Sequence, residues 1–247
     1  MTLQNIFCHP MECLMNDGNK MKEKEMKIKG AIFDMDGTLV DSLMFWGDFW
    51  KKFGKRYMND ESFKVDEKID KKVRTMIFGD ALIYMRDELA PHVSDEEILE
   101  FGSSGIVDFY IETAKIKPGA YALIEHLKSR GIKICIATAT DMKYVRVALD
   151  SCKLSEHFDI VMSCADIGVG KDKPDIYIKA MNTLGFKAEE ICVFEDSFVA
   201  LETAKKAGFK TVGLYDKYNF EQERLRAASD IYMEEGETLE KFIEEIN

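Results

Sequence analysis

The sequence predicts an α/β fold, a doubly wound parallel sheet into which a small α-helical domain is inserted. After residue 118, short apolar runs alternate with segments of helical length, which is typical of βα units. Between residues 43 and 117, aromatic residues recur at helical spacing and no convincing strand interrupts them. An apolar run before Asp34 supplies a further strand, which ends in a glycine-containing turn.

The chain begins with a segment that shows no clear periodicity. Residues 1–27 are polar and rich in methionine, so we expect a loosely ordered tail. Met26 stands almost directly before the first strand and is an alternative start of the natural protein. The first strand is the apolar run that begins at residue 28 and leads to Asp34.

Residues 43–117 are predicted to form a small helical bundle. Aromatic side chains recur every three or four residues near its start, at Phe45, Trp46, Phe49, Trp50 and Phe53. Such a stripe indicates the core-facing side of a helix rather than a cofactor site. Ser94, followed three residues later by Glu97, fits a capping box that opens a later helix. The Pro-Gly pair at 118–119 ends the region.

Residues 28–42 and 118–247 are predicted to form the core domain, a Rossmann-like sheet covered by helices. Helices are expected near residues 119–130, from about 142, over 175–184 and from 197 to the glycine at 208. Strands are expected over 132–138, 160–163, 191–195 and 211–214. The acidic stretch 234–245 is expected to form a terminal amphipathic helix. Ligands of such folds lie beyond the carboxyl ends of the strands. The polar residues at those ends are Asp34, Thr138, Glu195 and Asp196.

Composition excludes several classes of protein. With 247 residues, 46% of them hydrophobic and 32% charged, the chain can bury one large core and a smaller satellite. Its 34 basic and 45 acidic residues give a net charge of −11, which repels nucleic acid and anionic membranes. No apolar run is long enough to span a membrane and no signal-type segment begins the chain. We expect a cytoplasmic protein without nucleic-acid or membrane partners, and the oligomeric state stays open.

Cysteine and histidine chemistry is not expected. The six cysteines include no CxxC pair, and Cys135 and Cys192 lie inside apolar strand-like runs, so we expect reduced, structural thiols. The four histidines lie far from the motifs described below. Zinc or histidine acid–base chemistry is therefore disfavoured, and carboxylates remain the candidates.

Asp34 and Asp36 stand two residues apart where the first strand becomes a turn. This spacing suggests phosphoryl transfer, because one carboxylate can attack while the other exchanges a proton; the alternative is a pair of ordinary turn residues. The full string DMDGTLVDS resembles motif I of the haloacid dehalogenase superfamily, whose phosphatases and phosphomutases begin with this aspartate pair followed by Gly-Thr. The resemblance implies that Asp34 is the nucleophile and Asp36 the acid and base.

Thr138 resembles the Ser or Thr of motif II. A hydroxyl next to backbone N–H groups at a strand end can hold a phosphoryl oxygen. The alternative is a strand-end threonine that is followed by Asp141 as the cap of the next helix.

Lys171 resembles the motif III lysine, a cation that offsets the negative charge of the nucleophile and the phosphoryl group. The family usually has a proline directly after this lysine, and Lys173 before Pro174 is therefore a rival assignment. We favour Lys171 because its offset from the following Pro-Asp-Ile-Tyr segment resembles that of mutase-like members of the family. A phosphate-binding P-loop is excluded, because Ala165 and Asp172 stand where Gly and Ser or Thr are needed.

Glu195 and Asp196 resemble the acidic pair of motif IV, which completes a magnesium site. The resemblance implies Mg²⁺ held by Asp34, the main-chain carbonyl of Asp36 and Asp196, with Glu195 in support. Oxygen ligands suit this ion. Asp196 or Ser197 as a helix N-cap is the alternative and is compatible with metal binding.

The resemblance extends over residues 28–233 and implies an enzyme. The helical insert 43–117 resembles the small mobile cap of the branch that contains beta-phosphoglucomutase and phosphoglycolate phosphatase. We therefore expect a Mg²⁺-dependent phosphatase that hydrolyses small phosphorylated metabolites, such as sugar phosphates, through an aspartyl-phosphate.

Three other functions rank below the phosphatase. A phosphosugar mutase is the runner-up, because the same core can return the phosphoryl group to a different hydroxyl if the cap excludes water. It ranks below the phosphatase because mutases of this branch carry a histidine and an arginine early in the cap, where this chain has Trp46 and the segment 79–81 without arginine. A dehalogenase comes next, and a non-catalytic phosphoacceptor or binding protein follows. Substrate specificity is expected to lie in the cap. Its candidate contacts, each also compatible with a core or surface role, are Trp46, Trp50, Lys71, Arg74 and Arg86.

Overall fold

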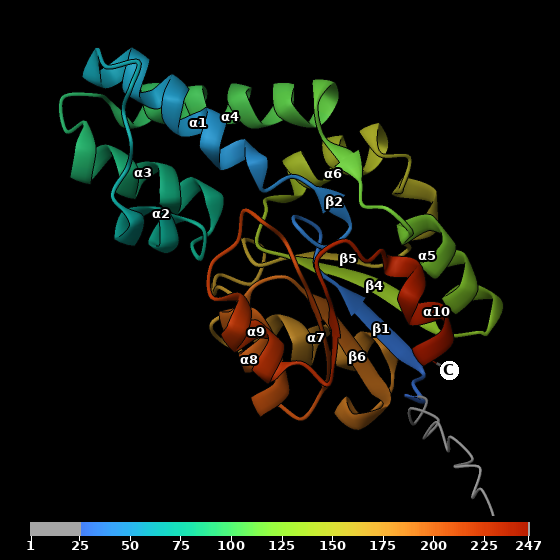
Figure 1. The fold of residues 1–247 in the computed structure, drawn as a ribbon. Helices are drawn as coiled ribbons and strands as arrows, with labels where there is room; N and C mark the ends of the chain where they lie inside the picture. The colour runs from blue at the N-terminus through green and yellow to red at the C-terminus, as the bar shows by residue number, and fades with distance from the viewer. Residues whose placement is uncertain (1–25, 247) are drawn as a thin grey trace, which may run out of the picture.

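A six-stranded parallel sheet lies at the centre of the computed structural model, which describes residues 26–246 (Figure 1). In spatial order its strands are β5 (Val161–Ser163), β4 (Lys133–Thr138), β1 (Gly30–Phe33), β6 (Ile191–Glu195), β7 (Lys210–Leu214) and β8 (Ile231–Met233). All neighbouring strands are parallel. The chain order changes direction at β1, where β4 lies on one side and β6 on the other. The predicted doubly wound α/β fold is confirmed.

Helices cover both faces of the sheet, and the residues of each strand alternate between them. On β1, Ala31 and Phe33 pack into the larger apolar cluster, whereas Ile32 packs into a second cluster on the other face. The first face is covered by α5 (Ala120–Ser129), α6 (Met142–Ser151) and α10 (Phe242–Glu245), and the second by α7 (Asp175–Leu184) and α8 (Phe198–Lys206). Burial on both faces explains why these strands are continuous apolar runs.

Four further helices lie together beyond the carboxyl ends of the strands (Figure 1). They are α1 (Met44–Phe53), which continues into a π-helical turn η1 (Gly54–Met58), α2 (Glu67–Val73), α3 (Phe78–Leu89) and α4 (Asp95–Glu112). Of the aromatic stripe of α1, Phe45, Phe49, Trp50 and Phe53 are buried, as predicted, whereas Trp46 is half-buried. Ser94 caps α4 by accepting a hydrogen bond from the Glu97 N–H at 3.2 Å. The division of the chain into a core (28–42 and 118–247) and a cap (43–117) stays a prediction.

Several short elements differ from the prediction. β2 (Val40–Asp41) pairs with β3 (Lys115–Ile116) as an antiparallel ribbon, so the expectation of no strand within 43–117 is wrong at its last residues. Two-residue strands carry no detectable periodicity. The seven-residue helix α9 (Gln222–Ala228) and the three-residue strand β8 were not predicted either.

The terminal helix predicted over 234–245 is wrong in extent. The structure forms only a 3₁₀ turn η4 (Leu239–Lys241) followed by the four residues of α10. Gly236 has a positive φ of 85°, and Thr238 is extended, so neither continues a helix. Two other 3₁₀ turns, η2 (Ser155–His157) and η3 (Ala188–Glu190), precede β5 and β6.

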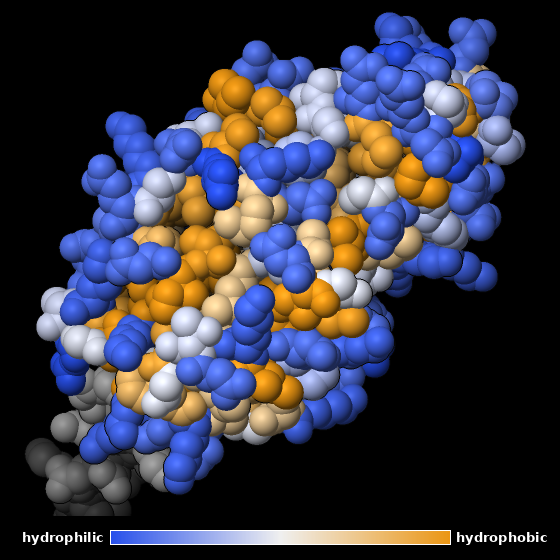
Figure 2. Space-filling model, turned by 180° about the vertical axis from the view of Figure 1, so that it is seen from behind, coloured by the Kyte–Doolittle hydropathy of each residue, from blue (hydrophilic) through white to orange (hydrophobic). Residues whose placement is uncertain are grey.

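The surface of the described residues carries scattered apolar side chains among hydrophilic ones, as the view from behind shows (Figure 2). The large apolar residues that are exposed are Met58, Leu99, Ile111, Tyr121, Ile178 and Tyr218. Between residues 26 and 246, no helix has the length and apolar character needed to cross a membrane.

The cysteines of the described residues are free thiols, as predicted. Cys135, Cys152, Cys164 and Cys192 are all buried, and burial raises the pKa of the Cys135 thiol to about 12. The other two cysteines, and all but the last two residues of the predicted tail 1–27, lie outside the described residues.

A buried ion pair joins the end of the β2–β3 ribbon to the loop after β7. Lys117 Nζ donates to Asp216 Oδ2 at 2.5 Å, and their side chains are 10% and 3% exposed. Lys117 also donates its backbone N–H to the Leu39 carbonyl at 2.8 Å. The ion pair therefore links the segment that follows α4 and β3 to the loop after β7.

Removing one partner of this pair should destabilise the protein. Asp216→Asn or Lys117→Met leaves a buried charge without compensation, and we expect each to lower the free energy of unfolding by about 3–5 kcal/mol. The measurement is denaturant unfolding. The double variant should be less destabilised than the sum of the single variants, and simple additivity would show that the two charges do not interact.

Candidate active site

The candidate site lies where the sheet changes direction, at the carboxyl ends of three adjacent strands. Asp34 follows β1, Thr138 ends β4, and Glu195 and Asp196 stand at the end of β6. The Asp34 backbone N–H donates to the Phe194 carbonyl at 3.0 Å, which extends the β1–β6 pairing to the site. The sheet thus brings together four residues that are up to 162 positions apart in the chain, between Asp34 and Asp196.

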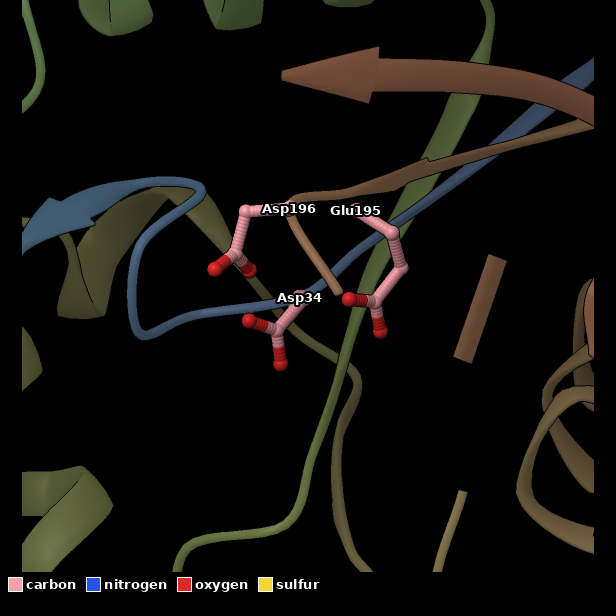
Figure 3. Close-up of side chains that lie close together, drawn as sticks. All are labelled: Asp34, Glu195 and Asp196. Carbon is pink, nitrogen blue, oxygen red and sulfur yellow. The ribbon is translucent and has the colours of Figure 1, made fainter. Parts of the chain in front are cut away.

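Three carboxylates converge at this point. Asp34, Glu195 and Asp196 are buried, and they each place one carboxylate oxygen within 4.8 Å of the others (Figure 3). The Asp36 carbonyl accepts no hydrogen bond from the residues that the structure describes. A set of oxygen donors that includes several carboxylates suits a hard divalent cation. The residues present therefore fit a metal ion.

Lys171 compensates part of this negative charge. Its Nζ donates to Asp34 Oδ1 and, at 2.5 Å, to Glu195 Oε1, and its side chain is 10% exposed. Burial alone would lower the pKa of the Lys171 ammonium, but attraction to Asp34 and Glu195 raises it above its usual range. Lys173, the rival assignment, is exposed to solvent, and the structure places Lys171 at the carboxylates.

Burial makes Asp34 and Asp196 hard to ionise in spite of Lys171. Desolvation, together with neighbouring carboxylates, raises the pKa of Asp34 well above its usual value, although Lys171 opposes this. For Asp196, burial and the nearby Glu195 raise the pKa to about 7. A bound cation would relieve both the desolvation and the repulsion.

Neighbouring polar groups orient the two carboxylates of β6. Tyr177 OH donates to Glu195 Oε1 at 2.9 Å. Asp196 receives hydrogen bonds from Thr38 Oγ1 at 3.3 Å and from Asn219 Nδ2 at 2.7 Å. Tyr177 and Asn219 were not singled out from the sequence, because nothing in their local pattern indicates a ligand.

Asp36 is held by three hydroxyl groups instead of by a cation. Tyr110 OH donates to Asp36 Oδ1 at 2.8 Å, Ser42 Oγ donates to the same oxygen at 2.7 Å, and Thr140 Oγ1 donates to Oδ2 at 2.8 Å. The side chain of Asp36 is thus separate from the carboxylate trio. Tyr110 comes from α4 and is 1% exposed, so the helical region takes part directly in the site.

The turn between the two aspartates requires its glycine. Gly37 has a φ of 85°, and a Cβ atom there would lie 2.4 Å from Asp196 Oδ2. Any side chain at this position would be strained and would push into the carboxylate trio. The physical reason for Gly after Asp36 is therefore both conformational and steric.

The site opens into a cavity of about 200 Å³ between the sheet and the helices α1–α4. Asp34, Asp36, Thr138 and Lys171 line it, together with Glu195 and Asp196. The Thr138 hydroxyl accepts a hydrogen bond from the Thr140 N–H at 3.1 Å. The structure therefore brings every predicted site residue to one cavity.

The candidate specificity residues divide into two groups. Trp46, Lys71 and Arg74 line the cavity. Trp50 is instead buried and donates to Asp70 at 2.8 Å, and Arg86 pairs with Asp95 at 2.6 Å away from the cavity lining.

Comparison with known proteins agrees with this geometry. The chain matches a family model described as haloacid dehalogenase-like hydrolase over residues 28–208. The chain belongs to this family. This match confirms the predicted family and enzyme class.

Two named relatives and one solved structure illustrate the similarity. A phosphorylated carbohydrates phosphatase from Thermotoga maritima is 26% identical over 189 residues, which cover 75% of this chain and 84% of the relative. Glycerol-1-phosphate phosphohydrolase 1 from Saccharomyces cerevisiae is 29% identical over 210 residues, which cover 81% and 80%. The crystal structure of CbbY from Rhodobacter sphaeroides in complex with phosphate superimposes with a TM-score of 0.70 at 23% identity, over 83% of this chain and 93% of that chain, and shows that the fold is shared.

Tyr110→Phe should separate positioning of Asp36 from packing of α4. The variant keeps the ring but removes the hydroxyl that donates to the carboxylate, and a hydrogen bond to a charged group contributes about 1.5–3 kcal/mol. We expect kcat for phosphomonoester hydrolysis to fall about 10- to 100-fold. Steady-state kinetics checks this, with Tyr84→Phe, outside the cavity lining, as the matched control. An unchanged kcat would show that Ser42 and Thr140 suffice.

Proposed function

We propose that this hydrolase is a Mg²⁺-dependent phosphatase of small phosphomonoesters that works through an aspartyl-phosphate on Asp34. The observation that carries the proposal is the arrangement of the cavity floor, where Lys171 bridges Asp34 and Glu195 while Asp36 stands apart on three hydroxyls. Two carboxylates in different environments suit two different chemical roles. The relatives named as phosphatases support the same reaction class.

Magnesium would be held by Asp34, the Asp36 carbonyl and Asp196, with Glu195 in support through its contacts to Lys171 and Tyr177. When bound, the ion supplies positive charge that offsets repulsion between the nucleophile and the anionic phosphate. Lys171 adds a second positive charge from the protein at the same point. Both groups are needed because phosphoryl transfer depends mainly on positioning and charge stabilisation.

Asp34 is the proposed nucleophile and Asp36 the proton carrier. Asp36 enters the cycle in its protonated form. The Asp34 carboxylate attacks phosphorus, and the bond from phosphorus to the leaving oxygen breaks as the Asp36 carboxyl group gives its proton to that oxygen. Asp36 then removes a proton from the water that attacks the aspartyl-phosphate, which releases phosphate and restores Asp34. The hydroxyls of Tyr110, Ser42 and Thr140 hold Asp36 in place through both steps.

Thr138 has the remaining role at the phosphoryl group. It lies at the end of β4 next to β1, is 1% exposed as a residue, and lines the cavity. Its hydroxyl can donate to a phosphoryl oxygen while it accepts the Thr140 N–H. This interaction fixes the orientation of the phosphate relative to Asp34.

The decisive test is phosphate release by the wild type and by Asp34→Asn with and without Mg²⁺. We expect turnover of phosphomonoesters only with the ion, and a loss of at least about 10³-fold in the variant, because an amide cannot form the covalent intermediate. A folded, Mg²⁺-loaded wild type that releases phosphate from none of a panel of esters contradicts the proposal. Isomerisation of a sugar phosphate without net release would instead indicate the mutase.

Metal binding should also appear as pH-dependent stability. Because the pKa of Asp196 is raised to about 7, the metal-free folded state binds a proton there that the unfolded chain releases near its ordinary value. The metal-free protein therefore gains stability from this group as the pH falls from 8 toward 5. Mg²⁺ binds the ionised form of Asp196, so the stabilisation that Mg²⁺ provides should increase as the pH rises from 5 toward 8.

At about 100 times its dissociation constant, Mg²⁺ should raise Tm by about 5–10 °C at pH 8 and by less at pH 5.5. Thermal unfolding with Mg²⁺ or with a chelator measures this. Asp196→Asn is the control and should abolish the difference. An equal shift at both pH values would mean that Mg²⁺ binds elsewhere.

A further inference from the structure

The cavity wall opposite the carboxylates is aromatic. Phe45 and Trp46 of α1, Phe78 of α3 and Phe109 of α4 all line the cavity. Their rings form one connected cluster, with centroids 5.5 Å apart for Phe45 and Trp46, 6.2 Å for Phe45 and Phe78, and 5.4 Å for Phe45 and Phe109. A leaving group that enters the cavity from the carboxylates therefore meets aromatic surface.

A further ring comes from the loop after β7. Phe220 lines the cavity and lies 5.1 Å from the Arg74 guanidinium, which is itself 5.9 Å from the ring centroid of Trp46. Arg74 also donates to the Tyr218 carbonyl at 3.0 Å. The guanidinium thus joins the helical region to the loop, and Phe220 and Trp46 are its two aromatic neighbours.

The polar side chains of this wall each have a partner within the protein. Arg74 makes two hydrogen bonds of 3.0 Å to Asp70, and Lys71 pairs with Glu67 at 2.8 Å. The Thr75 hydroxyl donates to the Lys72 carbonyl at 2.8 Å.

Two polar residues of the loop after β7 are likewise engaged. Glu221 pairs with Arg224 at 2.5 Å, and Asn219 donates to Asp196. Among the lining residues described, the polar side chains without a partner are Trp46, Asp172 and Ser197, and the last two adjoin Lys171 and Asp196 in the chain.

We propose that the preferred substrates are phosphomonoesters whose leaving group carries a flat apolar or aromatic ring, which packs against the aromatic residues that line the cavity, Phe45 and Trp46 of α1 and Phe220. This inference rests on the proposed phosphatase function. A polyol in the same place would bury hydroxyls against the rings of Phe45, Trp46 and Phe220, and an unsatisfied buried hydroxyl costs free energy. An aromatic ring instead gains contact with the rings of the wall. The indole N–H of Trp46 remains open for one polar substituent.

The test compares two esters with similar leaving-group chemistry. 2-Phenylethyl phosphate and glycerol 3-phosphate are both esters of primary alcohols, so a difference in rate is not dominated by the leaving-group pKa as it would be for an aryl phosphate. We expect kcat/KM for 2-phenylethyl phosphate to exceed that for glycerol 3-phosphate by at least about tenfold. Phosphate release with Mg²⁺ present measures both.

A pair of variants locates the preference. Phe220→Ala removes the ring from the cavity, and we expect the ratio of the two kcat/KM values to fall about three- to tenfold. Tyr218→Ala removes an exposed aromatic ring from the same loop, outside the cavity lining, and keeps the carbonyl that binds Arg74. The ratio should stay at the wild-type value in Tyr218→Ala.

The outcomes separate this inference from the function on which it rests. Hydrolysis of both esters with glycerol 3-phosphate equal or better would overturn the ring preference and leave the phosphatase intact. An unchanged ratio in Phe220→Ala would overturn the assignment of the ring site to this loop. Release of phosphate from neither ester, nor from any other phosphomonoester, would overturn the phosphatase proposal itself.

Discussion

Negative charge buried at the centre of the sheet is the constraint on which the site depends. Carboxylate oxygens of Asp34, Glu195 and Asp196 are brought within 4.8 Å of one another because β1 and β6 are neighbours, and all three residues are buried. Carboxylates in such a place are costly unless cations and hydrogen bonds compensate them. Lys171 supplies one cation and hydrogen bonds from Tyr177, Thr38 and Asn219 supply part of the remainder. The remaining excess of negative charge makes the cluster attractive to a divalent ion.

The same constraint explains why Asp36 is treated differently from Asp34. Two residues along the turn, its side chain leaves the cluster and meets three neutral hydroxyls, which stabilise a carboxylate without a full positive charge. Asp34 and Asp36 are therefore near each other in sequence but differ in surroundings, one facing an ammonium and the other facing Tyr110, Ser42 and Thr140. This division of environment is what allows neighbouring carboxyl groups to take separate roles.

Sequence analysis found the parts of the site that depend on strand ends and missed those that depend on packing. Asp34, Thr138 and Asp196 follow apolar runs that could be recognised one by one, and the parallel sheet necessarily gathers such ends. Tyr110 and Asn219 come from a helix and a loop with no motif, and only the tertiary structure shows that they reach Asp36 and Asp196. β3, β8 and α9 were missed because they are too short to show a clear hydrophobic period. α7 and β6, each longer than the missed elements of its kind, were predicted at their observed bounds.

The helical region and the sheet are joined by contacts of different kinds at several places around the cavity. Tyr110 reaches Asp36 from α4, Arg74 reaches the Tyr218 carbonyl from the end of α2, and Lys117 binds Asp216 where the chain returns to the sheet. Two of these contacts meet the same loop after β7, which also sends Asn219 to Asp196. Movement of the helices away from the sheet would therefore disturb the carboxylates as well as open the cavity. Because hydrogen bonds to Asp36 and Asp196 come from α4 and from the loop after β7, the surroundings of both carboxylates depend on how the helical region packs against the sheet.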